Sequence, residues 1–231
     1  MRVFLNLVML SCVFTVFSQE VKVPDFEALD SLYREDQFYV GLTYNILQQR
    51  PENLSQNKFS LGLSLGFLRD MPINKERTVA IAAGFGYSLN NFNQNLFITK
   101  LNGDTSYSLI DPDLTYDKNK IILHYVDLPI EFRWRTSTPS SHRFWRIYTG
   151  FKVSYLFFDN YKFKGNGNEF AIDGNGDLNK FQYGAYMAVG YNTWNFHMYY
   201  GLNPLFKNSA QLDGKPLEMH TLNIGLMFYI L

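Results

Sequence analysis

The chain has 231 residues, with 21 basic and 21 acidic side chains and a formal net charge of zero. This balance provides no basic excess for nucleic acid and no acidic tract for a charged partner. Aromatic residues make up 17 % of the sequence, and no apolar run after residue 18 approaches the roughly 20 residues of a membrane helix. Any membrane span must therefore be built from strands that close into a barrel.

The chain starts with the pattern of a secretory signal peptide. Met1-Arg2 is a short basic start, Val3–Phe17 is mostly apolar, and Ser18-Gln19 follows with a small residue suited to cleavage. We therefore interpret residues 1–18 as a signal peptide. The alternative is a lipoprotein with Cys12 as the lipid-bearing residue, but the residues after Cys12 remain apolar. Cleavage near Ser18 removes the only cysteine, so the mature chain forms no disulfide.

Residues 19–36 form a separate N-terminal segment in this interpretation. The segment carries six acidic residues, with Lys22 and Arg34 as its basic ones. Apolar residues recur at helical spacing after Pro24-Asp25, which is a suitable helix start. The pattern predicts a short periplasmic amphipathic helix whose apolar stripe contacts the barrel rim or an envelope protein partner. A mobile tether is the alternative.

Residues 37–231 are predicted to form an outer-membrane β-barrel domain. The alternation of strand side chains is clearest at Phe59–Phe67, with Phe and Leu on one face and Ser and Gly on the other. Eight such segments can be marked, at about 37–48, 58–68, 78–90, 120–135, 144–158, 180–191, 194–204 and 219–231. The number is ten if Leu96–Leu101 and Thr105–Ile110 add a hairpin to the barrel. Otherwise these two segments extend the neighbouring strands beyond the membrane.

The composition of the second face separates a membrane barrel from a soluble, lipocalin-like barrel. A face exposed to water should carry Lys, Glu and Asp, but this face carries small residues such as Gly62, Ser64, Ala82 and Gly184. Small residues suit the narrow interior of an eight-stranded barrel, so the wide apolar face has to meet lipid. The predicted fold class is therefore all-β: a single antiparallel up-and-down transmembrane β-barrel of eight strands.

Connection lengths predict the orientation of this barrel. With the N-terminus in the periplasm, odd-numbered connections should be long outer loops and even-numbered ones short turns. The three longest connections, 91–119, 159–179 and 205–218, are all odd-numbered. We therefore expect the outer membrane of a Gram-negative bacterium, with both termini periplasmic. Loops 91–119 and 159–179 form the expected contact surface, through the aromatic residues Tyr107, Tyr116, Tyr161, Phe163 and Phe170.

Two groups of residues are predicted at the periplasmic rim. Aromatic side chains favour the membrane interface, and five fall there with outward parity: Phe67, Trp134, Trp145, Trp194 and Phe228. The chain ends on Thr221–Leu231 (TLNIGLMFYIL), an alternating strand suited to closing the barrel. Its spacing Asn223-x-Gly225-x-x-Phe228-x-Ile230 resembles the terminal signal read by the bacterial barrel-insertion machinery, which is the expected assembly partner.

Charged residues with inward parity on the fourth and fifth predicted strands are Asp127, Glu131, Arg133, Arg146 and Lys152. If the turn between these strands is symmetric, Asp127 lies opposite Lys152 and Glu131 lies near Arg146. Buried charges have to be paired, and eight strands leave no open lumen. We therefore interpret the five as a salt-bridged network that fills the barrel; an ion or solute path is the alternative. Pro129 removes one ladder donor, so a bulge or local gap is expected beside it.

No catalytic, metal or cofactor site is predicted. None of the four histidines has a partner at metal-ligand spacing. Asp173–Asp177 (DGNGD) faintly resembles a calcium loop, but Leu178 and Gly184 occupy the positions where an EF-hand requires Gly and Glu. No serine–histidine–acid or paired-carboxylate motif stands out, so we expect a protein that is not an enzyme.

One segment carries a family resemblance. Tyr125–Phe132 reads YVDLPIEF, a proline inside a strand followed by an apolar run. It resembles the central strand of the outer-membrane β-barrel domain of PorT-like proteins of Bacteroidota. The resemblance implies an eight-stranded outer-membrane barrel. PorT itself is needed for type IX protein secretion, but the barrel here begins with DQFYVGLTYN at residues 36–45, which departs from what PorT leads us to expect. The resemblance is therefore carried over for the fold alone.

The expected function is a structural or protein-interaction role in the cell envelope, with an accessory role in secretion or surface assembly as one form of it. A narrow porin-like channel for small solutes or ions is the alternative. The expected partners are outer-membrane lipid and an envelope protein, bound through residues 19–36 or through the outer loops.

Overall fold

The computed structural model describes residues 35–230 except 57, 102 and 139–142. The predicted signal peptide and most of segment 19–36 lie outside the described residues. No helix in the described part is long and apolar enough to cross a membrane. Eight strands build the barrel: β1 (Gln37–Gln48), β2 (Leu61–Pro72), β3 (Val79–Asn93), β6 (Tyr116–Arg135), β7 (Trp145–Gly165), β9 (Phe181–Tyr191), β10 (Trp194–Gly201) and β13 (His220–Ile230).

The sheet closes on itself. The first strand, β1, pairs antiparallel with the last, β13, from Phe38 opposite Ile230 to Gln48 opposite His220. Pairing continues through β10, β9, β7, β6, β3 and β2 back to β1, so every barrel strand has two neighbours. The predicted all-β, eight-stranded fold is confirmed. The ten-strand alternative is wrong, because β4 (Leu96–Leu101) and β5 (Asp104–Leu109) form a two-stranded sheet of their own.

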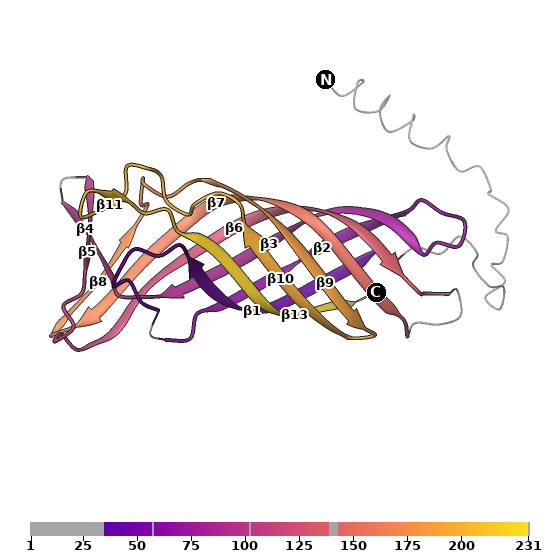
Figure 1. Ribbon diagram of the computed structural model, residues 1–231, viewed down its shortest axis with the longest axis horizontal. Helices are drawn as coiled ribbons and strands as arrows, with labels where there is room; N and C mark the ends of the chain where they lie inside the picture. The colour runs from indigo at the N-terminus through magenta and orange to yellow at the C-terminus, as the bar shows by residue number, and fades with distance from the viewer. Residues whose placement is uncertain (1–34, 57, 102, 139–142, 231) are drawn as a thin grey trace, which may run out of the picture. The chain divides into compact units, whose positions relative to one another are not determined.

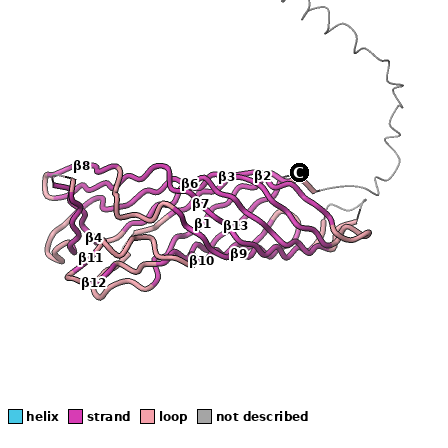
Figure 2. Tube along the Cα trace, turned by 90° about the horizontal axis from the view of Figure 1, so that it is seen from above, coloured by secondary structure: helices cyan, strands magenta, loops and turns pink. Residues whose placement is uncertain are grey.

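The two ends of the barrel differ in construction (Figures 1 and 2). At the terminal end β1 begins, β13 ends, and the connections are short. At the loop end, β6 and β7 extend to 20 and 21 residues, and β8 (Asn168–Asp173) folds back on β7. The β4–β5 hairpin and the short pair β11 (Gln211–Leu212) and β12 (Lys215–Pro216) lie at the same end. We call these loop-end elements the head.

Side chains alternate between the two faces of the barrel wall, with a register shift at Phe157 on β7. Along β6 all odd-numbered residues from Asn119 to Arg135 are buried, whereas Leu128 and Ile130 are exposed. Apolar side chains form the exposed outward face on all eight strands, and we call this surface the apolar belt. The period of two in the sequence thus becomes an apolar outside and a filled inside.

Interior tyrosine rings lie over glycines of neighbouring strands. A Cβ atom added at Gly86 would overlap the Tyr39 hydroxyl, and one added at Gly150 would lie 2.8 Å from the Tyr186 ring. Tyr199 lies over Gly184 in the same way. The small inward-facing residues therefore leave the space that the large interior rings occupy.

The irregularity expected beside Pro129 is confirmed. Between β3 and β6, pairing stops at Ala83 opposite Ile130 and resumes at Gly86 opposite Asp127. Pro129 remains paired with Lys152 on the β7 side. The missing proline N–H therefore interrupts one ladder and leaves the other intact.

We predict that Gly86→Ala destabilises the barrel by about 1–3 kcal/mol, because the added methyl group displaces the Tyr39 ring from a filled interior. Urea unfolding followed by tryptophan fluorescence in detergent micelles measures the change. Gly176→Ala is the matched control, since a Cβ there meets nothing within 4 Å. Equal unfolding midpoints for the two variants would contradict this packing.

Candidate functional site

The barrel interior is the candidate site, and its contents change from one end to the other. Charged side chains occupy the terminal end, amides and hydroxyls occupy the middle, and apolar side chains occupy the loop end. Each layer is built from inward positions of several strands, so its chemistry depends on register across the whole barrel.

Asp70 is the centre of the charged layer. Its carboxylate accepts hydrogen bonds from both guanidinium groups of β6, at 3.0 Å from Arg133 and at 2.9 and 2.8 Å from Arg135. All three side chains are fully buried. Glu35 lies 3.8 Å from Arg135, which completes a compact group of two acids and two bases. Buried charges of this kind persist only when each has its partner.

Burial affects the protonation of Glu35, which precedes the first strand. Desolvation raises the pKa of this carboxyl group above its usual value, against the opposing attraction of Arg135 and Arg146. The carboxylate lies in the mouth of the barrel and is 4 % exposed. Residues 35 and 36 are the described end of the predicted N-terminal segment, and they contact β2 through Asp70: Asp36 accepts a hydrogen bond from the Asp70 backbone N–H at 2.7 Å.

The predicted lumen residues all point inward, but their partners differ in part from the prediction. Lys152 forms an ion pair with Asp127 at 3.1 Å, and Ser154 donates a hydrogen bond to the same carboxylate at 2.5 Å. Glu131 accepts from Arg133 at 2.8 Å and from the Tyr186 hydroxyl at 3.1 Å. The five charges are thus distributed along the barrel rather than gathered in one group.

The prediction that Glu131 lies near Arg146 is wrong. The register places Arg146 opposite Arg135, nearer the terminal end, while Glu131 faces Gly150. The Arg146 guanidinium lies instead over aromatic rings, 4.6 Å from the Phe144 centroid and 5.4 Å from that of Tyr229. Cation–π contact therefore takes the place of the expected carboxylate.

Three residues of the charged layer were missed by the sequence analysis: Glu35, Asp70 and Arg135. Asp70 fell outside the predicted second strand, which continues to Pro72 in the structure. Its even number shares the inward parity of Gly62 and Ser64, and Arg135 shares that of Arg133. Extending the alternation past an exposed Arg69 would have found both residues.

The middle layer is polar and nearly solid. Asn90 accepts hydrogen bonds from Asn45 at 3.1 Å and from Asn223 at 3.2 Å, so amides from three strands meet at one point. The three cavities in this part of the barrel measure about 30, 20 and 20 Å³. A water molecule needs roughly 10–15 Å³ on this measure, so each cavity has room for one or two waters.

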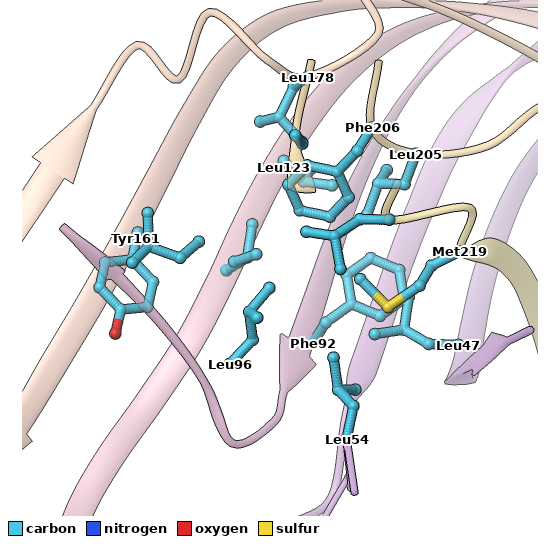
Figure 3. Close-up of a cluster of buried hydrophobic side chains, with 14 of the residues drawn as sticks. Leu47, Leu54, Phe92, Leu96, Leu123, Tyr161, Leu178, Leu205, Phe206 and Met219 are labelled. Atoms are coloured by element: carbon cyan, nitrogen blue, oxygen red, sulfur yellow. The ribbon is translucent and has the colours of Figure 1, made fainter. Parts of the chain in front are cut away.

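An apolar core closes the loop end (Figure 3). Side chains from the barrel strands, such as Phe92 and Leu123, meet Leu96, Phe206 and Met219 from the connections, and all five are buried. This core corrects the interpretation of the loop aromatics as a contact surface. Tyr161 and Phe163 are only 3 % and 5 % exposed, and Tyr107, Tyr116 and Phe170 pack against the same core. These side chains hold the head together. Tyr161 and Phe163 are buried because β7 continues to Gly165 with their side chains facing inward.

The predicted rim aromatics all lie at the terminal end. Trp134, Trp145 and Trp194 are exposed, and Trp194 contacts Phe228 with ring centroids 5.5 Å apart. Phe67 lies between Phe38 and Phe85. In the terminal signal, Asn223 and Gly225 face the interior, whereas Phe228 and Ile230 face outward.

A second group of outward aromatics borders the belt at the loop end, and the sequence analysis missed it. The Tyr87 hydroxyl lies 2.7 Å from Nδ1 of His124, whose ring contacts Phe157 and Phe158. These rings meet through the register of neighbouring strands, which cannot be predicted from the alternation of side chains alone.

The region resembling a calcium loop is held by its own hydrogen bonds. The Asn175 backbone N–H donates to Asp159 at 2.7 Å, and the Tyr107 hydroxyl lies 3.0 Å from Asp177. The described residues contain no group of three or more His, Cys, Asp or Glu side chains arranged to hold a metal.

The head carries a surface pocket of about 210 Å³ between the two connections predicted as contact loops. Loop 91–119 contributes Phe97, Leu109, Ile110, Asp111 and Leu114, and loop 159–179 contributes Phe163, Gly165, Asn166 and Asn168. The floor is apolar because Phe97 and Phe163 belong to the head core. A pocket of this size accommodates one large apolar side chain.

A closed eight-stranded barrel with an apolar outside defines a membrane-spanning β-barrel protein. The chain belongs to the family described as outer membrane protein beta-barrel domain, whose model matches residues 17–207. It is accordingly an outer-membrane protein. A search of curated proteins finds no match. Among solved structures, the attachment invasion locus protein Ail of Yersinia pestis is 13 % identical with a TM-score of 0.42, over 86 % of this chain and 100 % of Ail.

We predict that Asp70→Asn costs about 3–5 kcal/mol of unfolding free energy, because it leaves two buried guanidinium groups without their shared carboxylate. Urea titration in micelles measures the loss. Glu169→Gln is the control: it breaks an exposed ion pair with Lys164 and should cost at most about 1 kcal/mol. A loss no larger for Asp70→Asn than for the control would rule out the central place given to Asp70.

Proposed function

We propose that this protein is a non-conducting outer-membrane barrel with a protein-interaction role in the cell envelope. In this proposal both termini are periplasmic and the head projects from the cell. The barrel anchors and orients the head, and the head supplies the contact surface. An accessory role in secretion or surface assembly is one form of this proposed function.

The pocket on the head is the observation that carries the proposal. Both long loops line the pocket, so its shape depends on how two segments that are far apart in sequence are placed relative to each other. The buried head core fixes this placement before binding, and a preformed apolar pocket is the usual setting of an interface hot spot. The occupant we propose is a single large apolar side chain of an envelope protein.

The filled interior supports the same function over a channel. Asp70, Arg133 and Arg135 form ion pairs at the terminal end, the middle layer leaves room for only a few waters, and the loop end is closed by packed apolar side chains. An eight-stranded barrel has an interior just wide enough for such side chains.

The remaining parts of the proposal concern delivery to the membrane. Residues 1–18 direct secretion, and the spacing Asn223-x-Gly225-x-x-Phe228-x-Ile230 is read by the barrel-insertion machinery. The outward position of Phe228 and Ile230 at the terminal end supports this, since a partner reaches them from the rim.

A charge placed in the pocket should abolish partner binding. We predict that Leu109→Asp with Leu114→Asp removes the envelope protein that co-purifies with the wild-type chain after cross-linking in native membranes. The cause is the cost of burying a carboxylate in an apolar pocket. Quantitative mass spectrometry of the purified complexes measures the loss.

Leu101→Asp is the matched control, because Leu101 is 75 % exposed on the same hairpin and does not line the pocket. The control variant should retain the partner. Retention by the double variant, or equal loss in both variants, would exclude the pocket as the contact site.

A further inference from the structure

Four lysines share the outward face of β6 and β7 beyond the apolar belt: Lys118, Lys120, Lys162 and Lys164. Strand pairing places Lys118 opposite Lys164 and Lys120 opposite Lys162. We call this two-by-two group the lysine ribbon. Lys118 and Lys162 are exposed, and Lys120 and Lys164 are half-buried.

The depth of the ribbon follows from the strand geometry. The apolar belt reaches its loop-end border at His124 and Phe158, and Ile122 is the next outward residue on β6. Lys120 lies two residues nearer the loop end than Ile122, which is about 7 Å further along the strand. The ribbon therefore lies just outside the hydrocarbon, at the depth of lipid headgroups, and points in the same direction as the belt.

The charges of the ribbon are poorly compensated. Like charges directly opposite each other in a sheet are destabilising, and in the described part of the chain only Lys164 of the four forms an ion pair, with Glu169 at 3.2 Å.

A fifth lysine extends the positive surface. The Lys58 ammonium lies 5.6 Å from the centroid of the Tyr116 ring and donates to the backbone carbonyl of Asp117. Asp117, Glu169 and Asp173 are acidic residues beside this group. Five lysines against these three carboxylates leave positive charge in excess. The whole protein has a net charge of zero, which makes the excess a local feature.

We propose that the lysine ribbon binds the phosphate-bearing headgroup of a lipid in the leaflet around the loop end. Lysine ammonium groups bind phosphate as point charges, and clusters of them beside a membrane attract anionic lipid. Acyl chains attached to such a headgroup would continue along the apolar belt below. A freely soluble anion would gain nothing from that continuity. With the proposed orientation, the leaflet concerned is the outer one.

The test uses the full chain in uncharged maltoside micelles with monophosphoryl lipid A as the probe. Native mass spectrometry measures the apparent Kd of the lipid adduct, and the thermal unfolding midpoint is recorded with and without lipid. We expect K118Q/K120Q/K162Q/K164Q to bind at least about tenfold more weakly and to lose the lipid-dependent rise in midpoint. K75Q/K100Q/K207Q/K215Q removes the same charge from exposed sites elsewhere and should bind as the wild type does.

Several results would overturn the proposal. These are equal binding by the ribbon variant and the wild type, equal weakening in both quadruple variants, and undiminished binding of dephosphorylated lipid A. Displacement of the lipid by millimolar inorganic phosphate would assign the ribbon to a soluble anion instead. If the quadruple variant does not fold, as judged by heat-modifiable gel mobility, K120Q/K162Q takes its place.

The outcome is separable from that of the proposed function. Lipid binding in micelles depends neither on the orientation of the barrel nor on the head pocket. Leu109→Asp with Leu114→Asp should leave the lipid adduct unchanged. The ribbon variant should likewise retain the envelope partner.

Discussion

The pairing of β1 with β13 is the constraint on which the rest of the structure depends. Every backbone N–H and C=O group in hydrocarbon needs a partner within the protein, so the sheet has to close. Closure at eight strands leaves an interior only as wide as its own side chains. The inward-facing side chains must then fill the interior, and each large side chain needs a small residue beside it on a neighbouring strand. The fit of Tyr39 over Gly66 and Gly86, and of Tyr186 over Gly150, is the local result of that global constraint.

The same constraint explains how the interior is graded. At the terminal end the wall carries Asp70, Arg133 and Arg135, which are fully buried and joined by ion pairs through Asp70. At the loop end the wall continues beyond the belt, so Leu123 and Phe92 meet side chains from the connections and form a core. The head is therefore an extension of the barrel interior. Its pocket and the lysine ribbon are the two surfaces that this arrangement leaves available for binding.

Much of the fold could be predicted from the sequence because a period of two is enough to define strands and faces. Alternation at Phe59–Phe67 and the terminal strand led to eight strands, and Pro129 led to the gap beside it. Partners across strands could not be predicted in the same way, since a shift of register by a few residues moves Arg146 from Glu131 to Arg135. Tyr161 and Phe163 were wrongly predicted to be surface residues, because the segment predicted as a loop is the continuation of β7 in the structure.

The barrel is sealed by its own side chains, and planar-bilayer recording of the reconstituted full chain can detect any path through it. We expect no stable single-channel openings for the wild type, because charged side chains, amides and an apolar core occupy the lumen in succession. Stable openings that disappear in Asp127→Ala would contradict it, since they would show that the charged residues line a conducting path.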